Sequence, residues 1–275
     1  MDQVKLFVLS HDPRQLDEIK NRDSITLINL SALDLDRRIS GNELAENRFF
    51  LARIDYEAAQ VIGCVSARWE ERFPKYPTLQ NLPERISQLK GGEVLAPQGL
   101  VLNNSEFVKW VRNQDAVHPG MSAVMMDVIE FMKIDVSLRI QRRIVMGNNF
   151  VCSKDLFNDF LQFWREGFDY IDSKYGFEIP FTYRCPKCGL VDEEAIWRWT
   201  KARHPAFFYE RLTAIFFASR PDVSLLKIQN DRLVERKSSL QSKAMFGGPE
   251  VYKAINAPSR FFKSCTHAYK SLGKN

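Results

Sequence analysis

Residues 143–171 read RIVMGNNFVCSKDLFNDFLQFWREGFDYI. An apolar run stops at Gly147-Asn148-Asn149, and a second short apolar run follows this break. Ser153 is a typical N-cap residue, and the apolar side chains after it recur at helical spacing, which predicts a helix of about four turns. The stretch therefore predicts a strand, a polar break, a second strand and a capped helix. The break is interpreted either as a bulge with a solvated turn or as a place where a ligand approaches the backbone.

The whole chain has the composition of a globular protein. It holds 275 residues, 45% of them hydrophobic and 27% charged, with 20 Phe and 5 Trp for a large core. No apolar run approaches the roughly 18 residues of a membrane span, and the N-terminal apolar run is too short for a signal peptide. Five cysteines without a regular framework indicate a reducing compartment. We therefore expect a cytoplasmic protein.

The positive charge is concentrated at the C-terminal end. The net charge is +5, and residues 226–275 hold ten Lys/Arg against three Asp/Glu, a balance of +7 that leaves −2 for residues 1–225. We expect a catalytic domain over 1–225 and a basic extension over 226–275. The nearly neutral body argues against binding of nucleic acid, and the extension suits an anionic surface such as the inner face of a membrane, a solvated tail or a protein partner.

Strand-like and helix-like segments alternate along the chain, which predicts an α/β fold with a mostly parallel sheet flanked by helices. In such sheets, ligands collect at the carboxyl ends of the strands. Strands are expected at 4–9, 24–30, 61–66 and 93–97, and helices at 43–58, 107–111, 121–138 and 203–218. A long loop is expected at 70–92, with one turn of helix near Glu84–Leu89.

Polar residues follow the first predicted strand. Ser10, His11 and Asp12 stand at its carboxyl end, where they are candidates for donor binding, although Asp before Pro is also a common turn. Asp34-Leu35-Asp36 has the acid spacing that holds a divalent metal in many sugar-nucleotide enzymes. Two arginines follow it at once, so we expect a solvated loop there.

Two arginines stand where a phosphate could be bound. Arg68 comes just after the buried run 61–66, and a guanidinium binds phosphate through two parallel hydrogen bonds. Arg211 follows Glu210 in a segment that is apolar almost all round, where unpaired charges are costly. The structural alternatives are an ion pair of Arg68 with an acid such as Glu46, and a buried pair at 210–211.

Cys185 and Cys188 form the motif C-P-K-C-G, which is half of a zinc knuckle. A full site needs two more ligands, and the chain has no second C-x-x-C motif. Zinc, a redox-labile thiol pair and an inert turn are the open interpretations.

Three blocks of the sequence carry a resemblance to a known family. The first, Glu46 to Arg68, has E-x-x-x-x-L-x-x-x-D followed by I-G-x-x-x-x-R; the second, 147–157, has G-N-N-F-V and then K-D-L-F; the third, Arg203 to Ile215, has R-x-x-x-F-x-x-E-R-L. In order and spacing they are similar to GT-A-type glycosyltransferases that build bacterial capsule and O-antigen polysaccharide, a group first catalogued as a domain of unknown function. The resemblance covers about residues 1–225.

This resemblance implies a GT-A-like (Rossmann-like) domain with a nucleotide-sugar donor, accompanied by Mg²⁺ or Mn²⁺. Carried over by position, it implies donor contacts for Glu46, Arg68, Asn148 and Asn149.

The same resemblance implies that Glu210 and Arg211 are catalytic. Glu210 would take the proton of the acceptor, and Arg211 would neutralise the leaving diphosphate together with Arg68. The expected function is transfer of a sugar to a glycan or lipid-linked acceptor.

Two alternatives come from other classes of protein. One is a zinc-knuckle module that binds nucleic acid through Cys185, Cys188 and the basic tail. The other is a glycosyltransferase-like partner without catalysis, favoured because Ser66-Ala67-Arg68-Trp69 stands where the family has His-Tyr-Arg-Arg.

Overall fold

The structure is a computed structural model that describes residues 4–20, 22–33, 47–52, 54–56, 58–114, 121–138, 140–175 and 204–237. Several predicted features lie outside these residues: Asp34, Asp36, Glu46, Cys185, Cys188 and the basic segment 238–275.

Nine strands occur in the described residues: β1 (Val4–Ser10), β2 (Ile25–Asn29), β3 (Val61–Ser66), β4 (Glu93–Leu95), β5 (Gly99–Leu102), β6 (Arg142–Val145), β7 (Phe150–Ser153), β8 (Ser224–Gln229) and β9 (Arg232–Glu235). The helices are α1 (Pro13–Asp17), α2 (Arg48–Leu51), α3 (Trp69–Arg72), α4 (Leu82–Ile86), α5 (Asn104–Asn113), α6 (Met121–Phe131), α7 (Lys154–Tyr175) and α9 (His204–Ser219), with a 3₁₀ turn at Leu30–Ala32.

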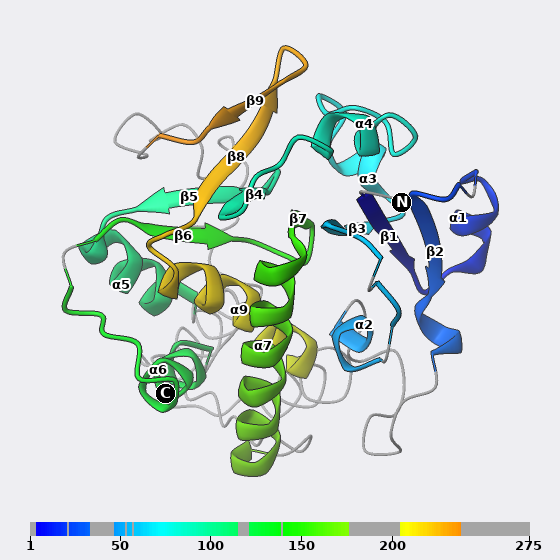
Figure 1. The fold of residues 1–275 in the computed structure, drawn as a ribbon. Coiled ribbons are helices and arrows are strands. Elements are labelled where there is room, and N and C mark those ends of the chain that lie inside the picture. Colours follow the sequence, from blue (N-terminus) through cyan, green and yellow to red (C-terminus); the bar gives the residue numbers. More distant parts are fainter. Residues whose placement is uncertain are drawn as a thin grey trace, which may run out of the picture.

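Seven strands form one mixed sheet in the order β2-β1-β3-β7-β4-β8-β9 (Figure 1). Five of them run in one direction, and β7 and β9 run in the opposite direction. Strands β5 and β6 pair antiparallel in a separate two-stranded sheet. The predicted α/β class and the mostly parallel sheet flanked by helices are confirmed.

Both faces of the sheet are buried, which explains why its strands are nearly continuous apolar runs. In β1, Phe7 and Leu9 join a core cluster that includes residues of α2, α5, α6, α7 and α9. The alternate residues Leu6 and Val8 join a second cluster with residues of α1, α3 and α4. The two-residue periodicity of a strand therefore divides one sequence run between two cores.

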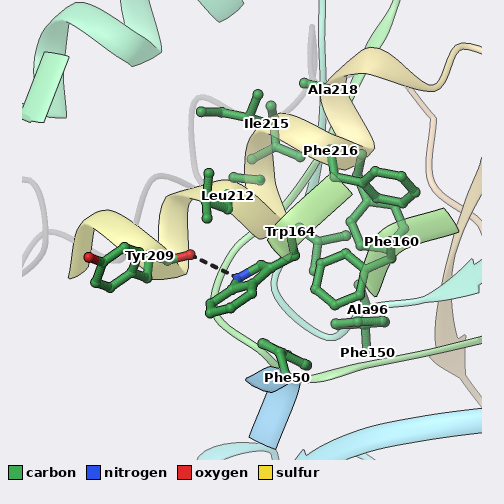
Figure 2. Close-up of a cluster of buried hydrophobic side chains, with 14 of the residues drawn as sticks. Phe50, Ala96, Phe150, Phe160, Trp164, Tyr209, Leu212, Ile215, Phe216 and Ala218 are labelled. Atoms are coloured by element: carbon green, nitrogen blue, oxygen red, sulfur yellow. Dashed lines mark hydrogen bonds between the residues drawn. The ribbon is translucent and has the colours of Figure 1, made fainter. Parts of the chain in front are cut away.

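The stretch 143–171 packs as predicted, with β6, the polar break, β7 and α7 in that order. Figure 2 shows the aromatic cluster that fixes it. The Phe150 ring lies 5.0 Å from the Phe160 ring and 5.3 Å from the Phe217 ring, and Trp164 Nε1 donates a 3.2 Å hydrogen bond to the Tyr209 carbonyl. These contacts hold β7, α7 and α9 together and fix the corner that precedes β7.

The predicted helix at 43–58 is wrong for most of its described part, because α2 spans four residues and residues 54–56 are not helical. Arg165 of α7 explains the early end. Its Nε and Nη2 atoms bond the carbonyls of Phe50 and Ala52, at 3.0 and 3.3 Å, which a longer helix would use internally.

Other boundaries also differ from the prediction. α7 has 22 residues and is longer than four turns, while α6 ends at Phe131, just before Lys133 with φ 53°. In the predicted loop 70–92, the expected helical turn near 84–89 is found slightly earlier as α4, and the end of α3 was not predicted. The apolar residues of both helices cover the second core. The predicted boundary between residues 225 and 226 falls inside β8, and the sheet continues to Glu235.

Candidate functional site

The candidate site lies where the strand order changes direction. From β1 the chain passes to β2 on one side and then crosses to β3 on the other, and ligands of open α/β sheets bind beyond the carboxyl ends at such a point. Ser10 ends β1 and Ser66 ends β3, and the Ala67 amide bonds the Leu9 carbonyl at 2.9 Å. Because β7 runs antiparallel to β3, its first residues reach the same edge, which places Asn149 beside Ser66.

The break before β7 is a tight corner. Gly147 has φ +72°, a left-handed conformation that favours glycine. Asn149 is 3% exposed, and its Oδ1 accepts a 2.8 Å hydrogen bond from the Ser66 amide. This bond joins the corner to the end of β3.

The neighbouring Asn148 holds three distant parts of the chain together. Its Nδ2 donates to Asn47 Oδ1 at 3.0 Å, and its Oδ1 accepts from Thr213 Oγ1 at 2.8 Å. All three residues are buried. The structure thus gives Asn148 a structural contact on each side of its amide.

Glu210 and Arg211 form a pair on α9. Arg211 Nη1 lies 3.2 Å from Glu210 Oε1, and the two side chains are 11% and 26% exposed, respectively. Arg211 Nε also donates to Gln114 Oε1 at 3.0 Å. The buried arginine is therefore paired within the chain, and its acid is the more accessible of the two.

Arg68 is paired with an acid that the sequence reading did not name. Its guanidinium lies against the Glu71 carboxylate through two hydrogen bonds, and the Nε–Oε2 distance is 2.7 Å. This contact raises the pKa of Arg68 and lowers the pKa of Glu71. The Arg68 amide donates to Ser66 Oγ at 3.2 Å, so the backbone adjoins the site while the exposed guanidinium meets Glu71. The two arginines of the predicted phosphate site are thus held by different acids.

Ser10 and Asp12 organise the start of α1. Asp12 is its N-cap, accepting from the Arg14 amide at 3.1 Å, and the Arg14 guanidinium lowers the pKa of Asp12. Ser10 Oγ donates to Gln15 Oε1 at 2.8 Å and accepts from the Asp12 amide at 3.0 Å. His11 is exposed. The turn that the sequence indicates here is confirmed, and donor binding by these residues stays a prediction.

Metal ligands are not gathered in the part of the chain that the structure describes. There, no group of three or more His, Cys, Asp or Glu could hold an ion. Of the acids predicted here, Asp12 is paired with Arg14, and Glu210 with Arg211. Within the same residues, no helix is long and apolar enough to cross a membrane.

The structure adds residues to which the sequence assigned no role in the site: Asn47, Ser66, Gln98, Gln114 and Thr213. Nothing in their spacing distinguishes them from ordinary surface or core polar residues. Only Gln98 carried a weak signal, since it follows a proline that ends a strand.

Comparison of the chain with protein-family models, with curated protein sequences and with solved structures finds no match. The candidate site is therefore interpreted from its own geometry.

Proposed function

We propose that this protein is a glycosyltransferase that moves a sugar from a nucleoside-diphosphate donor to a hydroxyl of a glycan or lipid-linked acceptor. The observation that supports it most is the contact between Asn47, Asn148 and Thr213. Each comes from a different one of the three blocks that resemble the glycosyltransferase family. Segments separated by 101 and 65 residues in the sequence therefore meet at one edge of the sheet.

The architecture supports the same proposal. A mostly parallel sheet binds nucleotides beyond the carboxyl ends of its strands, and the polar residues Ser10, Ser66 and Asn149 stand there. The antiparallel β7 and the small β5–β6 sheet bring the Gly147 corner to this edge (Figure 1). A GT-A-like domain is the form of α/β fold that we propose on these grounds.

The reaction assigns a role to each member of the Glu210–Arg211 pair. In an inverting transfer, the acceptor oxygen bonds to the anomeric carbon, the bond from this carbon to the diphosphate oxygen breaks, and the acceptor proton passes to a carboxylate. Glu210 is the accessible carboxylate at this edge, and the nearly buried Arg211 supplies positive charge where screening by water is weak. The Mg²⁺ or Mn²⁺ expected with the donor would need acids besides these, and Asp34 and Asp36 lie outside the described residues.

The proposal is tested by incubating the purified protein with a panel of nucleotide sugars and acceptors and measuring the release of nucleoside diphosphate. Glu210→Gln keeps the size of the side chain and removes its charge, so we expect turnover to fall by at least about a hundredfold. The control is Glu84→Gln, an exposed position on α4 that packs on the other face of the sheet. Absence of affinity for every nucleotide would contradict the proposal.

A non-catalytic partner protein is the second candidate, and one observation favours it. Arg68 and Arg211 each form an ion pair with an acid of the chain itself, so both guanidinium groups already have an anionic partner. This candidate predicts that no nucleotide sugar is turned over and that neither arginine contributes to binding of a nucleoside diphosphate.

A further inference from the structure

Three polar side chains gather around Gly147. A Cβ atom on this glycine would lie 3.5 Å from Gln98 Oε1, 3.7 Å from Glu210 Oε1 and 3.8 Å from Asn149 Nδ2. These are its three nearest neighbours outside the adjacent residues, and all three are polar groups at van der Waals distance. The three residues belong to the β4–β5 turn, to α9 and to the corner just before β7. Figure 1 shows these elements.

The orientation of the Asn149 amide follows from its one hydrogen bond. The Ser66 amide can only donate, so the atom that receives it is the oxygen, and the NH₂ group is on the other side. In the part of the chain that the structure describes, this NH₂ group makes no hydrogen bond. Nδ2 is not one of the fully buried unpartnered polar atoms there, so it keeps access from outside although Asn149 as a whole is 97% buried. An accessible donor of this kind can bond to water or to a polar group of a ligand.

Gln98 is exposed but stands on a fixed turn. Its carbonyl accepts from the Met146 amide at 3.1 Å, one residue before Gly147. Arg236 Nη2 bonds the carbonyls of Ala96 and Pro97 at 3.1 and 2.7 Å. The turn that carries Gln98 is therefore held against the corner, while its side chain stays available.

The charges and donors around this position select a neutral ligand group. An anion such as phosphate would meet the Glu210 carboxylate, and a cation would meet the Asn149 NH₂ group and the Arg211 guanidinium that is paired with Glu210 Oε1. A hydroxyl fits both, because its hydrogen donates to the carboxylate and its oxygen accepts from the amide.

We propose that Gly147, Asn149, Glu210 and Gln98 form a subsite for a carbohydrate hydroxyl. The hydroxyl donates to Glu210 and accepts from Asn149 Nδ2, and Gln98 bonds an adjacent hydroxyl. This subsite deepens the proposed glycosyltransferase function and rests on it for the source of the sugar, which is the donor sugar, the ribose of the nucleotide or the acceptor. Asn148, whose amide is bonded inside the protein, is not part of it.

The test is binding calorimetry on the full chain with UDP, UDP-glucose, GDP, GDP-mannose and a set of methyl glycosides. Gln98→Ala removes an exposed side chain and should weaken the ligand that occupies the subsite by about three- to tenfold. Asn149→Asp keeps the acceptor for the Ser66 amide but replaces the donor with an oxygen beside Glu210, so the loss should be at least about tenfold. Glu84→Gln is the control, and thermal unfolding confirms that each variant is folded.

The pattern of losses identifies the source of the hydroxyl. Loss for nucleotide sugars alone identifies the donor sugar, and equal loss for nucleoside diphosphates identifies the ribose. Binding of methyl glycosides but not of nucleotides, weakened by both variants, supports the subsite and contradicts a nucleotide donor.

Other results overturn the subsite. If nucleotides bind and neither Gln98→Ala nor Asn149→Asp changes any affinity, the hydroxyl subsite is wrong while the proposed function stands. If no nucleotide and no glycoside binds the wild-type protein, both are wrong.

Discussion

Two adjacent asparagines at the corner before β7 have different roles. Both are buried. Asn148 uses both ends of its side-chain amide, in hydrogen bonds with Asn47 and Thr213, whereas Asn149 uses only its amide oxygen, which accepts from the Ser66 backbone amide. The sequence presents them as one polar break. The difference comes from the partners that the fold brings to each amide, since a buried polar group is stable only when it is satisfied.

Removal of the Thr213 hydroxyl tests the structural role of Asn148. Thr213→Val has nearly the same shape but leaves Asn148 Oδ1 without its 2.8 Å donor in a fully buried position. We expect the free energy of unfolding to fall by about 1–3 kcal/mol, measured by urea denaturation. Thr213→Ser keeps the hydroxyl and loses one methyl group, which costs about 1 kcal/mol. A smaller loss for Val than for Ser would show that the hydrogen bond contributes little.

At the scale of elements, α7 and α9 approach closely because α7 carries a glycine at the contact. A Cβ atom on Gly167 would lie 2.6 Å from Leu212 Cδ2 and 3.4 Å from Met132 Cε. By helix propensity alone, a larger residue at this position should stabilise α7 by about 1 kcal/mol. The contact with α9 reverses this expectation.

Gly167→Leu should therefore destabilise the protein by about 1–3 kcal/mol, because the added atoms overpack a buried contact. The measurement is urea or thermal unfolding of the variant against the wild type. Combining it with Leu212→Ala should restore part of the loss, since the two side chains compete for the same space. If the effects of the two substitutions on the free energy of unfolding simply add, the two side chains do not compete for space. The loss in Gly167→Leu would then come from separation of α7 and α9.

Arg220, just after α9, pairs with two carboxylates, and its pair with Asp222 depends on pH. Arg220 binds Asp159 of α7 and Asp222, each at 2.8 Å, and its hydrogen bonds lower the pKa of Asp222 below the ordinary value of 3.8. A depressed pKa means that the folded state prefers the ionised carboxylate. The contribution is complete above about pH 4 and is lost as the pH falls through the folded pKa.

In this acidic range, the free energy of unfolding of Asp222→Asn should depend less on pH than that of the wild type. Asparagine has nearly the shape of aspartate, so the substitution mainly removes the ionisable group. The check is unfolding at a series of pH values from about 5 to 2 at low salt, because the Asp222 side chain is more than half exposed and salt screens the pair. Parallel pH profiles for the two proteins would show that Asp222 does not contribute.

At the scale of the molecule, the sheet extends past the predicted domain boundary. β8 pairs with β4 on one side and β9 on the other, and its residues Leu226 and Ile228 are buried. Arg236 then returns to bond the carbonyls of Ala96 and Pro97. A division of the chain by net charge misses this strand pair, because the residues after 225 are rich in Lys and Arg.

A chain ending at residue 225 should therefore be less stable than one ending at residue 237. Loss of the Leu226 and Ile228 side chains alone removes about 3–6 kcal/mol of hydrophobic stabilisation, and the unpaired edge of β4 adds to it. The comparison is made by thermal unfolding and by the tendency to aggregate. Equal stability of the two chains would mean that β8 and β9 are accessory to the sheet.

The prediction of elements from the sequence was strongest where local pattern is sufficient. The apolar runs of β1 and β3 and the capped helix after Ser153 follow from two-residue and helical periodicity, which depend on neighbours along the chain. The helix at 43–58 failed because Arg165, more than a hundred residues away, takes the Phe50 and Ala52 carbonyls. The glycosyltransferase function stays a proposal, because neither the sequence pattern nor the fold tests it.

By itself, the sequence determined the α/β class, the approximate strands and the polar break at Gly147-Asn148-Asn149. Only the tertiary structure decided which polar groups at that break are used and which are left open, because hydrogen-bond partners such as Ser66, Thr213 and Glu210 come from other parts of the chain. Spacing along the chain fixes which face a side chain takes, but the atoms that it meets there depend on how the elements pack.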